Sequence, residues 1–561
     1  MTTLPKPEMT GKPLDAKPPA GKPPAGKQGG LIRSSMVFSA FTLISKLLGF
    51  GRDVILSYFM GASSTVAADA FWMAFSFPNL FRRIFAEGAF ASAFVPAYSK
   101  SLTQDGEAVA DKLAADAMAV LATATLVITV AAELTMPWLV RVIAPGFAAI
   151  PEKYDLAVRL TQIMMPYLPC MAIYAHLSGV LNARNRFILS AAAPILLNLW
   201  MLLAVWPAQS TSDAAYYTAI GVVAAGLSQA ALLWWGVRRT GAHVGFGWPR
   251  MTPEIRGLIM LAVPGTIAAS AAQMNFFISG ILVSEVNGAR SWLAVCDRLY
   301  LLPQSLVGVA IGVALLPRLS RAVHAGDHHG GQAAIDEAMV FSMALTLPAA
   351  AALIGMPYFL TDALYTRGAF THFDAQQTAA ALLQYGWGVP AFVLQQLLSR
   401  VFFASQDTRT PMNYALISVA VNIAAGVAMF RLVGVAGIAA ATSLASWVNV
   451  LMMSSTLMRR GLWRPNAKAV SRLIRILVAS AALGGLTAFA SHERTAIEGA
   501  IAGFSLGPLG PKELAVATVS LLAAMLYPVL LFASGGLTLS EARAALRRNK
   551  GEAPASTADL L

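Results

Sequence analysis

Residues 187–207 read FILSAAAPILLNLWMLLAVWP and contain no charged side chain. An α-helix of about 20 such residues crosses the roughly 30 Å hydrocarbon core of a bilayer. Similar runs recur along the chain, in which 57% of the 561 residues are hydrophobic and only 12% are charged. A soluble domain carries about 25% charged residues, and the alternating pattern of an outer-membrane barrel is absent. The composition therefore predicts an all-α integral membrane protein.

About fourteen runs are long and apolar enough to be transmembrane helices. Several of them contain proline, which predicts tilted or kinked helices. The predicted spans are residues 33–58, 67–99, 113–143, 155–182, 187–207, 214–237, 254–285, 289–321, 335–361, 376–404, 411–430, 433–457, 469–490 and 514–534.

Lys and Arg residues set the predicted orientation of these helices. They gather in every second connection, as at Arg184 and Arg186, whereas residues 59–66 and 208–213 contain none. The basic side faces the cytoplasm, so we expect both termini there. This topology explains the net charge of +13 better than nucleic-acid binding does, because no basic stripe with interleaved aromatic residues is present.

The two ends of the chain are predicted to be cytoplasmic tails. Residues 1–30 combine lysine and proline with almost nothing apolar, and such a segment cannot bury enough surface to fold. We therefore expect residues 1–30 to be disordered, and their positive charge is attracted to anionic lipid. Residues 536–561 form the second predicted tail.

An internal repeat divides the part between the tails. The sequences around Pro96 and Pro317 are similar and lie 221 positions apart, and residues 177–180 and 398–401 recur at the same offset. This offset spans six helices, which predicts two lobes related by a parallel repeat, with a substrate site between them. The predicted units are residues 31–250 (helices 1–6), residues 251–460 (helices 7–12) and residues 461–535, which hold two extra helices.

The first predicted span carries polar residues on one side. With about 100° per residue, Ser45, Lys46, Gly49, Arg52 and Asp53 fall within an arc of about 120°. Ionisable residues inside a membrane are costly and usually face a cavity. We therefore expect this arc to line a hydrated cavity, with the glycine opening space at its middle.

Other charged residues lie inside the second and eighth spans. They are Asp69, Arg82, Arg83 and Glu87 in the second span, and Asp297 and Arg298 in the eighth. Lys46, Arg52 and Arg298 outnumber the nearby acids, which predicts an anion-binding site, and a diphosphate suits guanidinium groups. For the Arg83–Glu87 pair and for Asp297, salt bridges that hold the helices together remain an equal alternative.

No chemistry beyond transport is predicted. Cys170 and Cys296 lie apart in apolar segments, which indicates neither a disulfide nor a metal site. We predict no cofactor and no catalytic residue, and Glu133 in the third span stays unassigned. Because no ATPase motif is present, any driving force comes from ions, the membrane potential or consumption of the product.

Several stretches resemble the MurJ/MviN family of lipid II flippases, over roughly residues 31–535. They are residues 45–53, 68–71, 77–96, 297–299, 302–303 and 308–317. The resemblance implies the multidrug/oligosaccharidyl-lipid/polysaccharide exporter fold and a place in the bacterial inner membrane. It also implies the transport of undecaprenyl-diphosphate-MurNAc(pentapeptide)-GlcNAc for peptidoglycan biosynthesis and cell shape.

The resemblance further implies roles for individual residues. Lys46, Arg52 and Arg298 fall on positions that bind the headgroup, and residues 461–535 on a groove for the lipid tail. The positions implied to act in the cavity or its gating include Asp53, Asp69, Arg82, Arg83 and Glu87, and Ser45 and Asp297 are assigned there from the residues themselves. Where this chain has Lys46 the family usually has arginine, so the charge is kept and the planar fork is lost.

Other functions stay open at this point. The chain could carry another polyprenyl-diphosphate oligosaccharide, or be a non-transporting scaffold for wall synthesis that contacts other wall-synthesis proteins. A drug or cation exporter is disfavoured because its site needs net negative charge. A membrane enzyme acting on polyprenyl phosphates needs clustered acids or a nucleophile constellation, and neither occurs.

Overall fold

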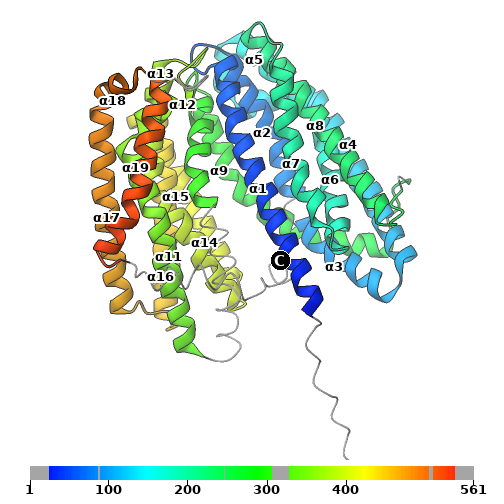
Figure 1. Ribbon diagram of the computed structural model, residues 1–561. Coiled ribbons are helices and arrows are strands. Elements are labelled where there is room, and N and C mark those ends of the chain that lie inside the picture. The colour runs from blue at the N-terminus through cyan, green and yellow to red at the C-terminus, as the bar shows by residue number, and fades with distance from the viewer. Residues whose placement is uncertain (1–24, 86–88, 246, 306–326, 504–509, 537–561) are drawn as a thin grey trace, which may run out of the picture.

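The computed structural model describes residues 25–85, 89–245, 247–305, 327–503 and 510–536 (Figure 1). Within these residues the chain forms helices and connecting turns, which confirms the all-α prediction. Most of the predicted tail 1–30 lies outside them, as do residues 537–561 of the second tail. Helix α1 begins at Ala25, within the last residues of the predicted tail. The last proline of the tail is Pro24, and nothing after it blocks a helix.

The helices follow the predicted spans closely. The N-terminal half contains α1 (Ala25–Met60), α2 (Ala67–Phe85), α3 (Ala89–Gln104), α4 (Glu107–Ile143), the 3₁₀ turn η1 (Pro145–Ala149), α5 (Pro151–Met164), α6 (Tyr167–Ala183), α7 (Phe187–Val205) and α8 (Thr211–Arg239). The C-terminal half contains α9 (Pro253–Val283), the helical residues 289–305, α11 (His328–Gly355), α12 (Pro357–Tyr365), α13 (His372–Gly386), α14 (Val389–Ala404), α15 (Arg409–Val433), α16 (Val435–Arg459), α17 (Ala467–His492), α18 (Arg494–Ile501) and α19 (Pro511–Ala533).

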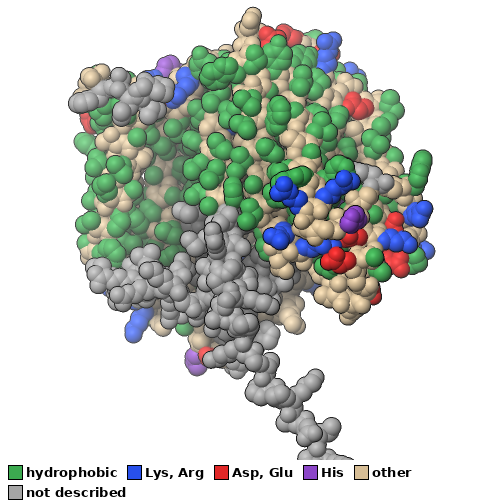
Figure 2. Space-filling model, turned by 45° about the vertical axis from the view of Figure 1, so that its right-hand side comes forward, with side chains coloured by type: hydrophobic (Ala, Val, Ile, Leu, Met, Phe, Trp, Pro, Cys, Tyr) green, Lys and Arg blue, Asp and Glu red, His purple; other side chains and the backbone are tan. Residues whose placement is uncertain are grey.

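Four predicted spans are each built from two helices. The span 67–99 is divided between α2 and α3, 155–182 between α5 and α6, 335–361 between α11 and α12, and 376–404 between α13 and α14. Nine helices in the described part of the chain are long and apolar enough to cross a membrane. On the face shown in Figure 2, hydrophobic side chains cover a wide area, and Lys and Arg gather in a patch below it at the right. This surface suits a protein that spans a bilayer.

The internal repeat is visible in the backbone. Asn185 and Gln406 lie 221 positions apart and are the non-glycine residues with positive φ in the described chain, at 59° and 58°. Each follows the end of a helix, α6 or α14, and is followed by an N–H that reaches back five residues: Arg186 to the Leu181 carbonyl, and Asp407 to Phe402. This is the hydrogen bond of a Schellman helix end. The same turn therefore occurs at equivalent places in the two halves.

The N-terminal half (α1–α8) and the C-terminal half (α9–α19) meet near the middle of Figure 1. In the N-terminal half α1 packs on α7, and α7 on α8; in the C-terminal half α15 packs on α16. Helix α9 packs against α3 of one half and α15 of the other. The C-terminal helices α17 and α19 pack on each other, and α17 packs on α11. The interface between the halves therefore runs through the centre of the molecule.

A buried carboxylate fastens the C-terminal helices at one end of the molecule. Asp362 of α12 is 1% exposed; its oxygens lie 3.1 Å from Lys512 Nζ, 3.3 Å from Arg494 Nη2 and 2.6 Å from His372 Nδ1. Burial alone would raise the pKa of Asp362, but hydrogen bonds from Lys512, Thr366 and His372 outweigh burial, and the pKa is below its ordinary value.

We expect Asp362→Asn to destabilise the protein by about 3 kcal/mol, because cations are left without their shared buried carboxylate. The depressed pKa means that the carboxylate stabilises the fold above the ordinary aspartate pKa of about 3.9, and that this is lost as the pH falls below it. Thermal unfolding in detergent between about pH 6 and pH 3 is the measurement. A variant with the same unfolding temperature and pH dependence as the wild type would contradict this role.

Candidate functional site

Arg52 and Asp53 of α1 form a buried pair at the interface of the two halves. Each residue is 2% exposed, and Arg52 Nε and Nη2 lie 2.8 and 2.5 Å from Asp53 Oδ1. Arg52 Nη1 also donates to Asn198 Oδ1 of α7, at 2.9 Å. Asn198 in turn donates to the Ser45 carbonyl at 2.9 Å. The polar arc of α1 is therefore held by an amide from the neighbouring helix.

Arg298 brings the other half of the protein to the same carboxylate. Its Nε forms an ion pair with Asp53 Oδ2, so arginines from the two halves share one aspartate. The Arg298 side chain is 39% exposed, whereas Arg52 is buried. We call Arg52, Asp53, Asn198 and Arg298 the central cluster. Of the two arginines in this cluster, Arg298 is therefore the one that a ligand can reach without a rearrangement of the helices.

The remaining predicted cavity residues are placed differently. Lys46 is exposed, and Gly49 packs against Asn198, where a methyl group would be at ordinary contact distance. Asp297 hydrogen-bonds Tyr300 of its own helix and interacts electrostatically with Arg298. Arg82 and Arg83 lie on α2, but their side chains are outside the described residues, as is the whole of Glu87. The predicted Arg83–Glu87 pair therefore stays a prediction.

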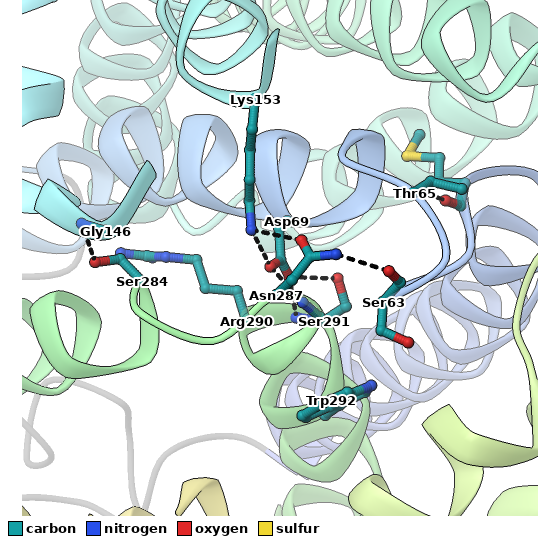
Figure 3. Close-up of polar contacts among 12 residues, drawn as sticks. Ser63, Thr65, Asp69, Gly146, Lys153, Ser284, Asn287, Arg290, Ser291 and Trp292 are labelled. Carbon is teal, nitrogen blue, oxygen red and sulfur yellow. Dashed lines mark hydrogen bonds and ion pairs between the residues drawn. The ribbon is translucent and has the colours of Figure 1, made fainter. Parts of the chain in front are cut away.

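Asp69 lies in a different place from the central cluster. Its carboxylate, 0% exposed, accepts from Lys153 Nζ at 2.7 Å, Gly288 N at 2.7 Å, and Ser291 N and Oγ at 3.0 and 2.9 Å (Figure 3). Lys153, 1% exposed, also donates to Asn287 Oδ1 at 2.9 Å. Asp69 and Lys153 belong to the N-terminal half, and their other partners to the C-terminal half. This network therefore holds the two halves together.

Further hydrogen bonds join the two halves next to this network. Asp374 of α13 accepts from Ser63 N and Oγ at 2.9 and 2.5 Å and from Trp292 Nε1 at 2.9 Å. Asn287 Nδ2 donates to the Ser63 carbonyl at 2.7 Å. Burial alone would raise the pKa of Asp374, but these hydrogen bonds and that from Thr371 lower it below its ordinary value. We call these contacts, with those of Asp69, the seam.

Glycines allow the backbones to approach closely at the seam. A methyl group on Gly146 would overlap the Ser284 carbonyl oxygen, and one on Gly288, whose φ is +89°, would lie 2.8 Å from Ser63 N. Gly146 N donates to Ser284 Oγ at 3.1 Å across the same contact. The closed seam therefore depends on the absence of a side chain at these two positions.

We expect Gly146→Ala to open the seam, because backbone atoms have to move apart to accept the new methyl group. A cysteine at the buried position Ala62, in a chain without the two native cysteines, reports this opening through labelling by a membrane-impermeant maleimide. Gly257→Ala is the control, because a methyl group there meets open space. Equal labelling of the two variants would contradict the prediction.

The sequence did not identify several residues of this site. Asn198 lies within the charge-free run 187–207, where a single amide was the available signal. Lys153 and Asp374 each precede a predicted span by two residues, so they were counted as loop positions. Their roles arise from contacts between residues more than eighty positions apart, which sequence spacing does not reveal.

Similar folds occur among solved membrane transporters. An inward-facing multidrug resistance transporter of the MATE family matches with a TM-score of 0.62 at 13% identity, over 76% of this chain and 98% of that one. A structure titled as the lipid II flippase MurJ in an inward closed conformation matches with a TM-score of 0.72 at 23% identity, over 88% and 98%. These likenesses show the fold of a multi-pass helical membrane protein.

The sequence comparisons are more specific. Residues 56–503 match the family described as Lipid II flippase MurJ, and the chain belongs to this family. It is 38% identical to a probable lipid II flippase MurJ of Rhizobium tropici, over 94% of this chain and 98% of the relative. It is 33% identical to the lipid II flippase MurJ of Burkholderia cenocepacia, over 81% and 89%.

Proposed function

We propose that this chain moves lipid II, undecaprenyl-diphosphate-MurNAc(pentapeptide)-GlcNAc, from the cytoplasmic to the periplasmic leaflet by alternating access. The observation that supports it best is the central cluster, where Arg52 and Arg298 from opposite halves share the single carboxylate of Asp53. Lipid II is named as the substrate because the chain belongs to the Lipid II flippase MurJ family. The protein acts as a transporter and not as an enzyme.

The charges at the centre favour an anionic headgroup. Arg52 and Arg298 lie on facing helices with two acids, Asp53 and Asp297, and the exposed Lys46 of α1 adds a third cation, so positive charge is in excess. A diphosphate accepts bidentate hydrogen bonds from a guanidinium group. It competes with Asp53 for Arg298, which is partly exposed and can turn towards a ligand.

The orientation follows from the basic connections. With these in the cytoplasm, both termini are cytoplasmic and the seam lies at the periplasmic end, in the inner membrane of a bacterium. The headgroup enters from the cytoplasmic side while its polyprenyl chain stays in lipid beside α17 and α19. The halves then part at the seam. One charge moving across the membrane potential is worth about 2.3 kcal/mol per 100 mV, which is enough to bias such a cycle.

The test places this chain as the sole lipid II flippase in a depletion strain and measures lipid II exposed to the periplasm. We expect the wild-type chain to restore exposure and growth. Restored exposure of a different polyprenyl-diphosphate oligosaccharide, without lipid II, would assign the chain to that substrate. Growth without any lipid exposure would favour a scaffold for wall-synthesis proteins.

A further inference from the structure

A polar pocket lies in the C-terminal half, beside the helix that carries Arg298. Its volume is about 430 Å³, within the range of roughly 300–1,000 Å³ that ligand pockets occupy. Gln304, near the end of the helical residues 289–305, forms part of the wall, and α14 forms the rest. The lining residues on α14 recur at intervals of three and four, so one face of this helix is turned to the pocket. They include Phe392, Gln395, Gln396, Ser399 and Arg400.

Arg400 brings a positive charge to this pocket without a counterion. Its Nη1 is buried and makes no hydrogen bond, and no acidic side chain of the described chain pairs with it. A guanidinium group stays charged and has five N–H groups to donate. Burying such a donor without an acceptor is costly, and a cation inside a membrane span usually faces a cavity that serves a function. The structure therefore leaves an acceptor for Arg400 to be supplied by a ligand.

The other polar groups of the pocket are side-chain amides. Gln304, Gln395 and Gln396 line it, and their amide groups make no hydrogen bond to the residues that the structure describes. Each primary amide both donates and accepts hydrogen bonds, as a peptide group does. The Ser399 hydroxyl, in contrast, donates to the Gln395 carbonyl of its own helix at 2.7 Å. The pocket therefore suits a ligand that combines an anionic group with peptide amides.

The fold itself does not require these polar side chains. At the repeat offset of 221 positions, Gln396 and Arg400 correspond to Ala175 and Gly179 of α6. A methyl group on Gly179 would lie 3.2 Å from the ring of Phe94, so this face of α6 is tightly packed. The N-terminal half thus has close packing at the place where the C-terminal half has a charged pocket.

The pocket lies on the side of Arg298 that is away from the seam. Ser291 contacts the seam, Arg298 follows after seven residues, and Gln304 follows after six more. Gln304 is therefore about 9 Å beyond Arg298 along the helix axis. Between them, the ring of Tyr300 lies 5.4 Å from that of Phe392 of α14, measured between centroids. A ligand held at Arg298 can thus extend along this helix to the pocket.

We propose that this pocket binds a carboxylate of the headgroup's pentapeptide. Arg400 pairs with the carboxylate, and the amides of Gln304, Gln395 and Gln396 hydrogen-bond to the peptide groups next to it. In lipid II the diphosphate and the peptide are both attached to MurNAc, so one molecule is held at Arg298 and at Arg400 together. This inference rests on the proposed function, and it makes Arg400 a residue that selects a peptide-bearing substrate.

The experiment measures binding of two synthetic ligands, farnesyl-diphosphate-MurNAc with and without the pentapeptide, to the full-length protein in nanodiscs. The peptide gain is the ratio of their dissociation constants. We expect a gain of at least about tenfold for the wild type, the effect of roughly one charge-assisted hydrogen bond. Arg400→Gln is expected to remove this gain, as is conversion of every carboxylate of the peptide to an amide. Arg409→Gln is the control, because Arg409 is an exposed cation of α15 outside the pocket lining.

A peptide gain that survives Arg400→Gln or amidation of the peptide would overturn the carboxylate site. An equal loss of affinity for the two ligands in Arg400→Gln would also overturn it, and would place the diphosphate at Arg400. If Arg400→Gln does not fold, Gln396→Leu gives the second test, because Gln396 is exposed to the pocket. We expect it to reduce the gain, and an unchanged gain would contradict the proposal.

The binding measurement does not depend on transport. A wild-type chain that shows a peptide gain dependent on Arg400 but exposes no lipid II would refute the proposed transport alone. Exposure of lipid II by a wild-type chain without a peptide gain would refute the carboxylate site alone.

Discussion

Replacing Arg298 by alanine is expected to abolish lipid II exposure, with a loss of at least about a hundredfold. Arg298 is the arginine of the central cluster with a partly exposed side chain, and it joins the two halves through Asp53. A hydrogen bond between charged groups contributes about 1.5–3 kcal/mol, and a bidentate contact to phosphate makes two of them. The alanine variant loses these contacts, and Asp53 keeps its ion pair with Arg52 but no longer pairs with Arg298.

The measurement is lipid II exposure in the depletion strain with matched membrane expression. Arg298→Lys keeps the charge without the planar fork, so we expect partial activity from it. Arg239→Ala is the control, since Arg239 is exposed on α8 and stacks on Trp235 at 4.1 Å, far from the central cluster in the sequence. Normal growth supported by Arg298→Ala alone would remove the central cluster from the mechanism.

The fold could be predicted from the sequence because a bilayer imposes simple conditions on it. A spanning helix needs about 20 apolar residues, and within the described residues each predicted span coincides with one helix or with two consecutive helices. The repeat offset seen at residues 177–180 and 398–401 recurs in the positive-φ residues Asn185 and Gln406. The start of the first helix was less predictable, because α1 begins at Ala25, directly after Pro24.

The candidate site could be predicted only in part. Helical periodicity placed Ser45, Arg52 and Asp53 on one face, where Ser45 and Arg52 contact Asn198 and Asp53 pairs with Arg52. Periodicity describes one helix at a time, however. It did not show that Asp69 meets Lys153 and the start of the helix at 289, because those contacts depend on how the two halves pack. Charged residues at helix ends carry no apolar pattern, so the seam was not visible in the sequence.

The closed seam is expected to depend on Lys153 more than on any other single side chain. In the closed state Asp69 is 0% exposed, and Lys153 is the cation that contacts it, at 2.7 Å. Lys153→Met leaves this carboxylate buried without a cation, and removing one partner of a buried pair costs about 3–5 kcal/mol. Parting of the halves hydrates Asp69 and relieves the cost. The variant therefore shifts the equilibrium towards the open seam by a factor of about a hundred or more.

The maleimide labelling of a cysteine at Ala62 measures this shift, and lipid II exposure is expected to fall because the seam no longer closes. Replacing Asp69 by asparagine in the Lys153→Met chain removes the unpaired charge while keeping an oxygen that accepts from Ser291 N. We therefore expect the double variant to be labelled less than Lys153→Met alone, as for two residues in contact or in one network. Additive effects of the two substitutions on labelling would mean that the Lys153–Asp69 pair does not control the seam, and that closure rests on Asp374, Ser63 and Trp292 instead.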